Sequence, residues 1–238
     1  MTIVAIHQPN FFPWLGYFDK ISRSDVFIFL DDVQYQKTGG SWSNRVKVLI
    51  NCEGRWLTAP VDRSFHGSRY VNEMEFSSKE NWRSKLIKSV TSTYKRTPFF
   101  DEIYLVIEAL IKNPENNVAT YNIHTIKTLT SALGYSTKSM INSSDLRTES
   151  SSTERLIELI MGAHGKTYLC GGGSSGYQED EAFHKAGIKL SYQNFLQPTY
   201  TQFGCEHFVG GLSIIDALMN LGFEGTRKLI GNNVDENT

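Results

Sequence analysis

The first thirty residues combine short apolar runs with one amphipathic stretch. The run Thr2–Ile6 is rich in β-branched residues and ends at a polar loop, which predicts a buried strand of a parallel sheet. Residues Trp14–Ser24 place their apolar side chains on one helical face, and Val26–Leu30 is a second apolar run. The pattern therefore predicts one βαβ unit.

The next segment changes to the two-residue period of a half-buried strand. Apolar and polar residues alternate within Ser43–Pro60, and Asn51–Gly54 in the middle has the composition of a turn, so we predict a β-hairpin. The following stretch, Asp62–Tyr70, is polar and has no period, which indicates either an ordered surface loop near the site or a mobile loop.

Three helical patterns follow the loop, over Ser78–Tyr94, Pro98–Ile111 and Asn116–Leu133. The Ser77-Ser78 pair can cap the first helix, and Gly134 closes the last. We expect residues 78–134 to pack as a layer or as a helical subdomain.

Helices and strands alternate again in the C-terminal part. The predicted elements are a helix over residues 152–165, a strand over Lys166–Cys170, a helix over Glu179–Ala186, a strand over Ile188–Gln193 and a helix over Leu212–Asn220. We expect the tail Asn232–Thr238 to fray. The element order predicts an α/β fold with a mostly parallel, Rossmann-like sheet and helices on both faces. The hairpin and the helical insertion are additions to this single domain of residues 1–238.

Composition narrows the classes of partner. The formal net charge of −1 over 238 residues supplies no broad basic field, so we expect no duplex nucleic acid as partner. The sequence shows no basic leader and no apolar run near the ~20 residues that a membrane helix needs. We therefore expect no membrane insertion and a cytoplasmic location.

The cysteines and histidines do not have the spacing of metal ligands. Cys52, Cys170 and Cys205 are far apart and include no C-x-x-C pair, so we expect reduced thiols in the core. No histidine pair shows a zinc-binding spacing, so we expect no bound zinc.

The loop between the first strand and the first helix is the strongest candidate for a site. Ligands of open α/β sheets bind outside the carboxyl ends of strands, where helix N-termini offer free N–H groups. His7, Gln8, Asn10 and Trp14 occupy this position, and two prolines stiffen the loop. The alternative is that its aromatic residues pack on the core.

Two carboxylates follow the second predicted strand. Asp31 and Asp32 are adjacent, and because neighbouring strand residues point to opposite faces, at most one of them should address a given pocket. One could act in catalysis or hold Mg²⁺ together with ATP, and Gln34 could contact substrate.

The hairpin carries polar and basic residues that could bind an anion. Arg45 and Lys47 share one face of a strand and follow Asn44, so the two cations could hold a phosphate or a carboxylate. The alternative is a solvated strand edge.

Two polar segments follow the C-terminal strands. The first is the glycine-rich loop 171–177, where Gly172, Ser174 and Tyr177 could contact substrate. The second contains Gln193, Tyr200 and Gln202 and, like the first loop of the chain, is aromatic and stiffened by proline. We expect these segments to line one pocket with His7, Asn10 and the Asp31–Asp32 pair.

The N-terminal motif resembles the signature of the WbqC-like family. It spans residues 7–21, Ser24–Phe27 and Leu30–Gln34. Further hallmarks of the family stand in the expected order at Thr153–Leu156, Gly187-Ile188, Tyr192-Gln193, Pro198–Gln202 and Leu212–Asp216. The resemblance covers essentially the whole chain. Two positions depart from the pattern: Gln178-Glu179 stands where members tend to have Leu-Asp, and Gln197 where His is common.

This resemblance implies a role in bacterial surface-polysaccharide (O-antigen) biosynthesis. The expected activity is N-acylation of a nucleotide-linked amino sugar by aminoacyl or glycyl transfer, with an amino acid plus ATP, a thioester or a charged tRNA as donor. His7 would be the general base, since a histidine with an ordinary pKa near 6.5 suits that task.

Two rival classes remain open. One is a nucleotidyl or phosphoryl transferase that uses ATP and Mg²⁺ held by Asp31 or Asp32. The other is a non-catalytic module that binds carbohydrate or nucleotide.

Overall fold

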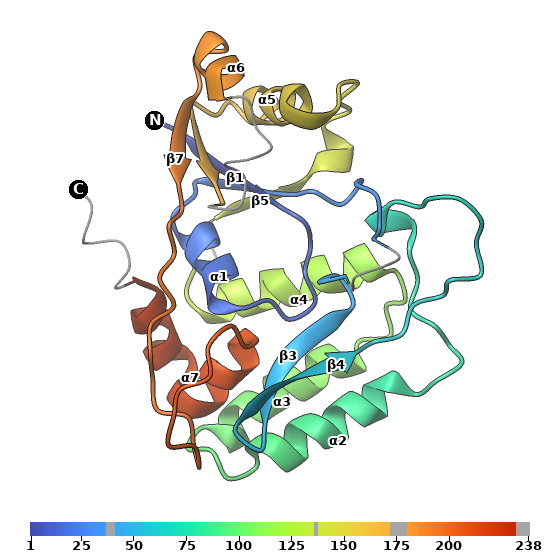
Figure 1. Cartoon of the computed structure of the whole chain (residues 1–238), viewed down its shortest axis with the longest axis vertical. Coiled ribbons are helices and arrows are strands. Elements are labelled where there is room, and N and C mark those ends of the chain that lie inside the picture. Colours follow the sequence, from blue (N-terminus) through green and yellow to red (C-terminus); the bar gives the residue numbers. More distant parts are fainter. Residues whose placement is uncertain (37–40, 136–137, 172–179, 232–238) are drawn as a thin grey trace.

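A five-stranded parallel sheet runs across the upper part of the molecule in the view of Figure 1. The computed structural model describes residues 1–36, 41–135, 138–171 and 180–231. The strand order is β5-β2-β1-β6-β7. The strands are β1 (Ile3–His7), β2 (Val26–Phe29), β5 (Ser139–Asn142), β6 (Thr167–Cys170) and β7 (Lys189–Tyr192). The predicted α/β class with a mostly parallel sheet is confirmed.

The predicted hairpin and helices are also present, and the hairpin, α2 and α3 lie below the sheet in the view of Figure 1. Strands β3 (Arg45–Ile50) and β4 (Glu53–Thr58) pair in antiparallel fashion. The helices are α1 (Leu15–Ser22), α2 (Trp82–Tyr94), α3 (Phe100–Lys112), α4 (Val118–Ala132), α5 (Ser152–Gly162), α6 (Asp180–Lys185) and α7 (Ile214–Gly231), and the short 3₁₀ turns are η1 (Val71–Glu73) and η2 (Ser143–Asp145).

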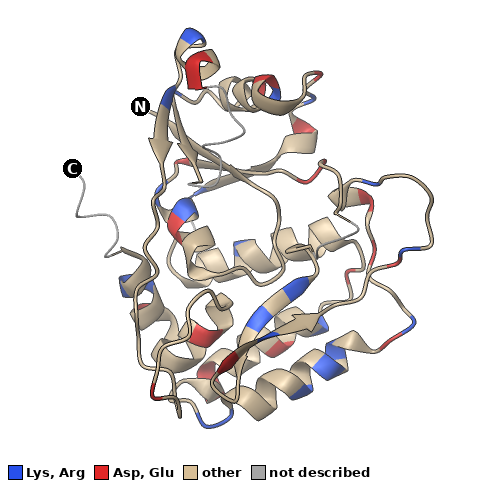
Figure 2. Ribbon diagram, in the orientation of Figure 1, with Lys and Arg blue, Asp and Glu red and all other residues tan. Residues whose placement is uncertain are grey.

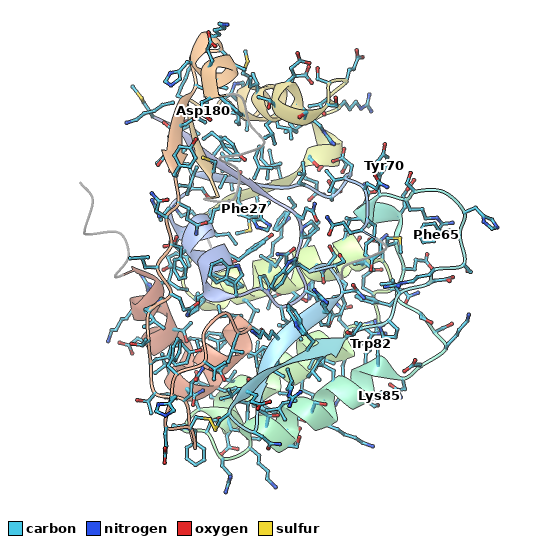
Figure 3. All side chains as sticks on the ribbon, viewed as in Figure 1. Phe27, Phe65, Tyr70, Trp82, Lys85 and Asp180 are labelled. Atoms are coloured by element: carbon cyan, nitrogen blue, oxygen red, sulfur yellow. A yellow bond between two sulfur atoms is a disulfide. The ribbon has the colours of Figure 1, made fainter. Side chains whose placement is uncertain are left out.

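The two faces of the sheet pack into two separate cores. Because strand side chains alternate between faces, Ala5 and Phe27 enter a large core with α1, α4 and α7. Ile6 and Ile28 enter a smaller core beneath α5 and α6. Phe27 is labelled in Figure 3 within the larger core. Helices on both faces are therefore confirmed, and buried residues of α2 and α3 belong to the same large core.

Several element boundaries differ from the predicted ones. Helix α2 begins at Trp82, four residues late, because Asn81 caps it by accepting a hydrogen bond from the Ser84 amide at 3.1 Å. Strand β5 was not predicted from the sequence. Helix α7 continues beyond Asn220 to Gly231.

Helix α7 is interrupted at Gly222. Its φ of 69° and ψ of −178° are not helical, and two helical segments meet there. A β-carbon on Gly222 would lie 2.7 Å from the Phe99 ring. Glycine is therefore required both by backbone conformation and by close packing.

The cysteine prediction is wrong for two of the three residues. Cys52 and Cys205 form a disulfide with a Cα–Cα distance of 5.5 Å, and Cys170 alone is a free, buried thiol. The two partners are 153 residues apart in sequence, so their proximity depends on the tertiary fold and not on a local spacing.

Within the described residues, no helix combines the length and apolar character that crossing a membrane requires.

Candidate functional site

The chain reverses its winding direction between β1 and β6. From β1 it passes through α1 to β2 on one side, whereas from β6 it passes through α6 to β7 on the other (Figure 1). The carboxyl ends of two such strands flank a crevice in which open α/β proteins bind ligands. His7 ends β1 and Gly171 follows β6, so both residues lie at this switch point.

His7 is a partly buried, neutral imidazole. Its Nδ1 lies 3.1 Å from the Gln8 carbonyl, and because a carbonyl only accepts, Nδ1 carries the proton and Nε2 keeps its lone pair. The ring packs edge-on to Tyr17 at 4.7 Å. Burial, together with the positive charge of Lys20, lowers the pKa of His7 to about 3. The expectation of an ordinary pKa near 6.5 is therefore wrong.

Lys20 is the site residue that the sequence analysis missed. It lies on α1 and is only 4% exposed. Burial lowers the pKa of Lys20 to about 8, against the opposing influence of Cys170 and Asp19. A β-carbon added to Gly171 would lie 3.4 Å from the Lys20 Nζ, which places the amine at the end of β6. Lys20 thus brings an amine of unusual pKa to the switch point beside His7.

The loop that leaves β1 is held rigidly by neighbouring elements. The Tyr17 hydroxyl donates to the Gln8 carbonyl at 2.9 Å, and the Asn122 amide donates to the carbonyls of Pro9 and Ser43. Asn10 is buried in this loop. The loop is therefore preorganised, as the two prolines predict.

The second half of the same loop faces the hairpin. Asn10, Trp14, Arg45 and Lys47, four residues predicted to contact substrate, line a shallow depression between the loop, β3 and Ser213. We call this depression the hairpin groove. The basic positions of β3 are visible in Figure 2.

Asn44 and Gln34 are placed near the hairpin but outside the groove. The buried Asn44 amide accepts from the Tyr35 hydroxyl at 3.0 Å and donates to the Ala59 carbonyl at 2.8 Å. Gln34 is exposed and forms a bridge with Tyr70. Asn44 therefore orders the hairpin, and its contact with substrate stays a prediction.

Asp31 and Asp32 converge on a single partner. Strand β2 ends at Phe29, so the alternation of faces no longer applies, and both carboxylates contact the Ser143 hydroxyl. The argument that they must point apart is wrong for this reason. Asp32 also pairs with Arg155 at 2.5 Å. Both carboxylates are engaged within the protein, which favours a structural role, and catalysis by either one stays a prediction.

Gln193 connects the end of β7 to α1. Its side-chain nitrogen donates to the Gly16 carbonyl at 2.6 Å and to the Asp19 carboxylate at 2.8 Å. Its backbone carbonyl accepts from the Arg23 guanidinium at 2.7 Å. These bonds use its side-chain nitrogen inside the protein and fix α1, the helix that carries Lys20.

Tyr200 and Gln202 surround a buried carboxylate. The Tyr200 hydroxyl lies 2.7 Å and the Gln202 amide nitrogen 2.9 Å from the same oxygen of Asp216, which is 0% exposed. Burial raises the pKa of Asp216, and these two hydrogen bonds oppose the effect. Asn10, Trp14, Arg45 and Lys47 therefore line the hairpin groove, whereas Tyr200 and Gln202 contact Asp216, and one pocket shared by all the candidates stays a prediction.

Three candidates, Gly172, Ser174 and Tyr177, lie outside the described residues. Within the described part of the chain, no three His, Cys, Asp or Glu side chains gather closely enough to hold a metal ion.

The fold and the residues at its switch point define a class: a doubly wound α/β protein with polar side chains at the carboxyl ends of β1 and β6. The model of the WbqC-like protein family matches residues 8–228, and the chain belongs to that family. It is similar to a mycobacterial protein named "Uncharacterized protein Rv1507c", from Mycobacterium tuberculosis (strain ATCC 25618 / H37Rv). The identity is 28% over 229 residues, covering 94% of this chain and 96% of the relative. No solved structure matches the chain.

Proposed function

We propose that this WbqC-like protein is a transferase that N-acylates an amino group of a nucleotide-linked amino sugar. The observation that carries the proposal is the pairing of His7 and Lys20 at the switch point between β1 and β6. One group is a neutral acceptor and the other is an amine that is still mostly protonated at pH 7. Acyl transfer to an amine uses both kinds of group.

The sugar nitrogen attacks the acyl carbon, a C–N bond forms, and the carbonyl oxygen becomes negatively charged. The Lys20 ammonium would stabilise this oxyanion, since a preorganised positive charge in a site of low dielectric is an effective catalyst. The leaving group then departs with its bonding electron pair. The proton lost by the nitrogen passes to Nε2 of His7.

The low pKa of His7 is compatible with this role because it belongs to the protein without ligand. The oxyanion that forms beside Lys20 offsets the positive charge that, after burial, helps to lower the pKa of His7. The imidazole therefore becomes a stronger base as the C–N bond forms. The ATP- and Mg²⁺-dependent alternative is weaker, because its two carboxylates are engaged with Ser143 and Arg155.

The test is incubation of the protein with nucleotide-linked amino sugars and three kinds of donor: amino acid plus ATP, aminoacyl thioester, and charged tRNA. We expect a product heavier by one acyl group in mass spectra. Lys20→Met should lower kcat by roughly 10²-fold or more, while Lys127→Met, which changes an exposed lysine on α4, should not. Absence of product with every donor, or normal turnover in Lys20→Met, would contradict the proposal.

A further inference from the structure

The outer face of the hairpin carries two tryptophans and two cations. Lys47 lies directly across from Trp56, and Arg45 lies across from Thr58, so both cations and Trp56 share one face of the β3–β4 pair. Trp42 precedes β3, and its ring contacts that of Trp56. Val46 and Val48 point the other way and are buried in the large core. The hairpin therefore has one structural face and one face available for binding.

The aromatic residues of this surface are unusually exposed. Trp42 is 50% and Trp56 is 39% exposed, and their rings meet edge to face at 5.0 Å. The Arg45 guanidinium lies over the Trp56 ring at 4.2 Å. Large apolar rings gathered at a surface often mark a binding site. The cation–π contact holds Arg45 and Trp56 in a fixed geometry before any ligand arrives.

The hairpin groove adjoins these rings. Trp42 lines one side and Trp14 another, and the only charged side chains among its described lining residues are Arg45 and Lys47. Trp14 is supported from behind by Phe195 at 5.2 Å. The groove thus combines aromatic walls with local positive charge in a chain whose formal net charge is −1.

Two further contacts fix the shape of the groove. The Ser213 amide donates to the Lys47 carbonyl at 2.8 Å, and the Ser213 hydroxyl donates to the Phe12 carbonyl at 2.8 Å. One residue therefore ties the strand to the loop on the opposite side. The Lys47 side chain lies across Gly54, where a β-carbon would come within 2.4 Å of its Cε. Such preorganisation reduces the entropy lost on binding.

We propose that the exposed surface over the hairpin groove, formed by Trp42, Trp56, Arg45 and Lys47, binds the nucleoside diphosphate part of the substrate, because the groove itself has a cavity volume of only about 10 Å³. The base would stack on the exposed Trp42 ring, which Trp56 supports edge to face, since every nucleobase has a flat π face. Arg45 and Lys47 would pair with the phosphate oxygens. This inference rests on the proposed function, because it assigns one part of that substrate to a place.

The groove lies close in sequence and in space to the end of β1. His7 ends β1 and Asn10 lines the groove, and three residue steps limit their Cα–Cα distance to about 11 Å. A nucleotide-linked sugar bound with its phosphates at the hairpin can therefore extend its sugar toward His7 and Lys20.

Titration calorimetry with uridine, guanosine, adenosine and thymidine diphosphates tests the inference. The corresponding nucleosides, which lack the phosphates, are the control ligands. We expect at least one diphosphate to bind and its nucleoside to bind more weakly. Lys47→Ala should weaken diphosphate binding by about tenfold or more and reduce its salt dependence. Trp56→Ala should weaken binding of diphosphate and nucleoside alike.

The hairpin supplies its own control. Arg55 is an exposed cation on the opposite face of β4, paired with Glu53, so Arg55→Ala should bind as the unmodified protein does. His7→Asn should also leave diphosphate binding unchanged. Circular dichroism and thermal melting of each variant show whether it has folded.

The outcomes separate the two proposals. In one outcome, Lys47→Ala loses diphosphate binding, and neither the unmodified protein nor a variant transfers an acyl group. This result would support the groove assignment and contradict the proposed function. Acyl transfer with an unchanged KM for the nucleotide-linked sugar in Lys47→Ala and Trp56→Ala would overturn the groove assignment alone. The same conclusion follows if no diphosphate binds, or if Arg55→Ala has the larger effect.

Discussion

The disulfide between Cys52 and Cys205 joins the turn of the hairpin to the segment that precedes α7. A link across 153 residues of sequence restricts the unfolded chain strongly. Cys170 remains as a thiol inside the smaller core.

We predict that the oxidised native protein has no rapidly reacting thiol and shows one after denaturation. The double variant Cys52→Ser/Cys205→Ser should lose about 2–5 kcal/mol of free energy of unfolding. Thiol titration and urea unfolding measure the two quantities. Reductant should destabilise the unmodified protein but leave the double variant unchanged. Three reactive thiols in the oxidised, denatured protein would show that the bond does not form.

The second prediction concerns the titration of His7. Its pKa is about 3 in the folded protein against 6.5 for an ordinary histidine, so the unfolded chain binds the extra proton between these pH values. The stability contributed at neutral pH is therefore lost as pH falls from about 6.5 toward 3. NMR should show a neutral His7 ring throughout pH 5–8. His7→Asn should flatten the acid slope of stability, and His124→Asn, at an exposed site on α4, should not. A His7 midpoint near pH 6.5 would contradict the assignment.

The third prediction concerns the buried carboxylate of Asp216. Tyr200→Phe removes the hydrogen bond of 2.7 Å and leaves one acceptor less well satisfied. We expect a loss of about 1–3 kcal/mol in the free energy of unfolding, because a buried acceptor that loses its partner keeps its desolvation penalty. Tyr70→Phe changes an exposed tyrosine and should have little effect. Equal stability of the two variants would mean that water replaces the lost bond.

The fourth prediction concerns the break in α7. Gly222→Ala places a β-carbon 2.7 Å from the Phe99 ring in a left-handed backbone, so we expect destabilisation of more than about 1 kcal/mol. The double variant Gly222→Ala/Phe99→Ala separates the two causes, since it relieves the clash but keeps the backbone strain. Thermal unfolding measures both. A stabilised Gly222→Ala protein would show that α7 becomes continuous instead.

The sequence predicts the fold better than it predicts the site. Strands β1, β2 and β6 are recognisable because they are buried on both faces and therefore read as uninterrupted apolar runs. Strand β5 escapes detection because its four residues include Ser139 and Asn142 and pair on one side only.

The misjudged site residues share one cause, which is that their partners are distant in sequence. From the sequence, Lys20 is expected to be a solvent-exposed lysine of a helix. In the structure it is buried, with Gly171 at the end of β6 beside its Nζ. Gln193, Tyr200 and Gln202 have the composition of a binding loop, but their hydrogen bonds lead to α1 and α7. Polar character indicates that a residue needs partners, and only the tertiary structure shows whether these are protein groups.

The central position of β1 also determines when the site can form during synthesis. Ile3 pairs with Thr167, and the loop after β1 is tied down by Ser213. The ribosome therefore releases His7 long before it makes the residues that enclose it. Until β6 and α7 emerge, this apolar N-terminal segment has only β2 as a sheet neighbour and exposes an unpaired strand edge. The strand order therefore leaves this edge of β1 open until the ribosome has made β6.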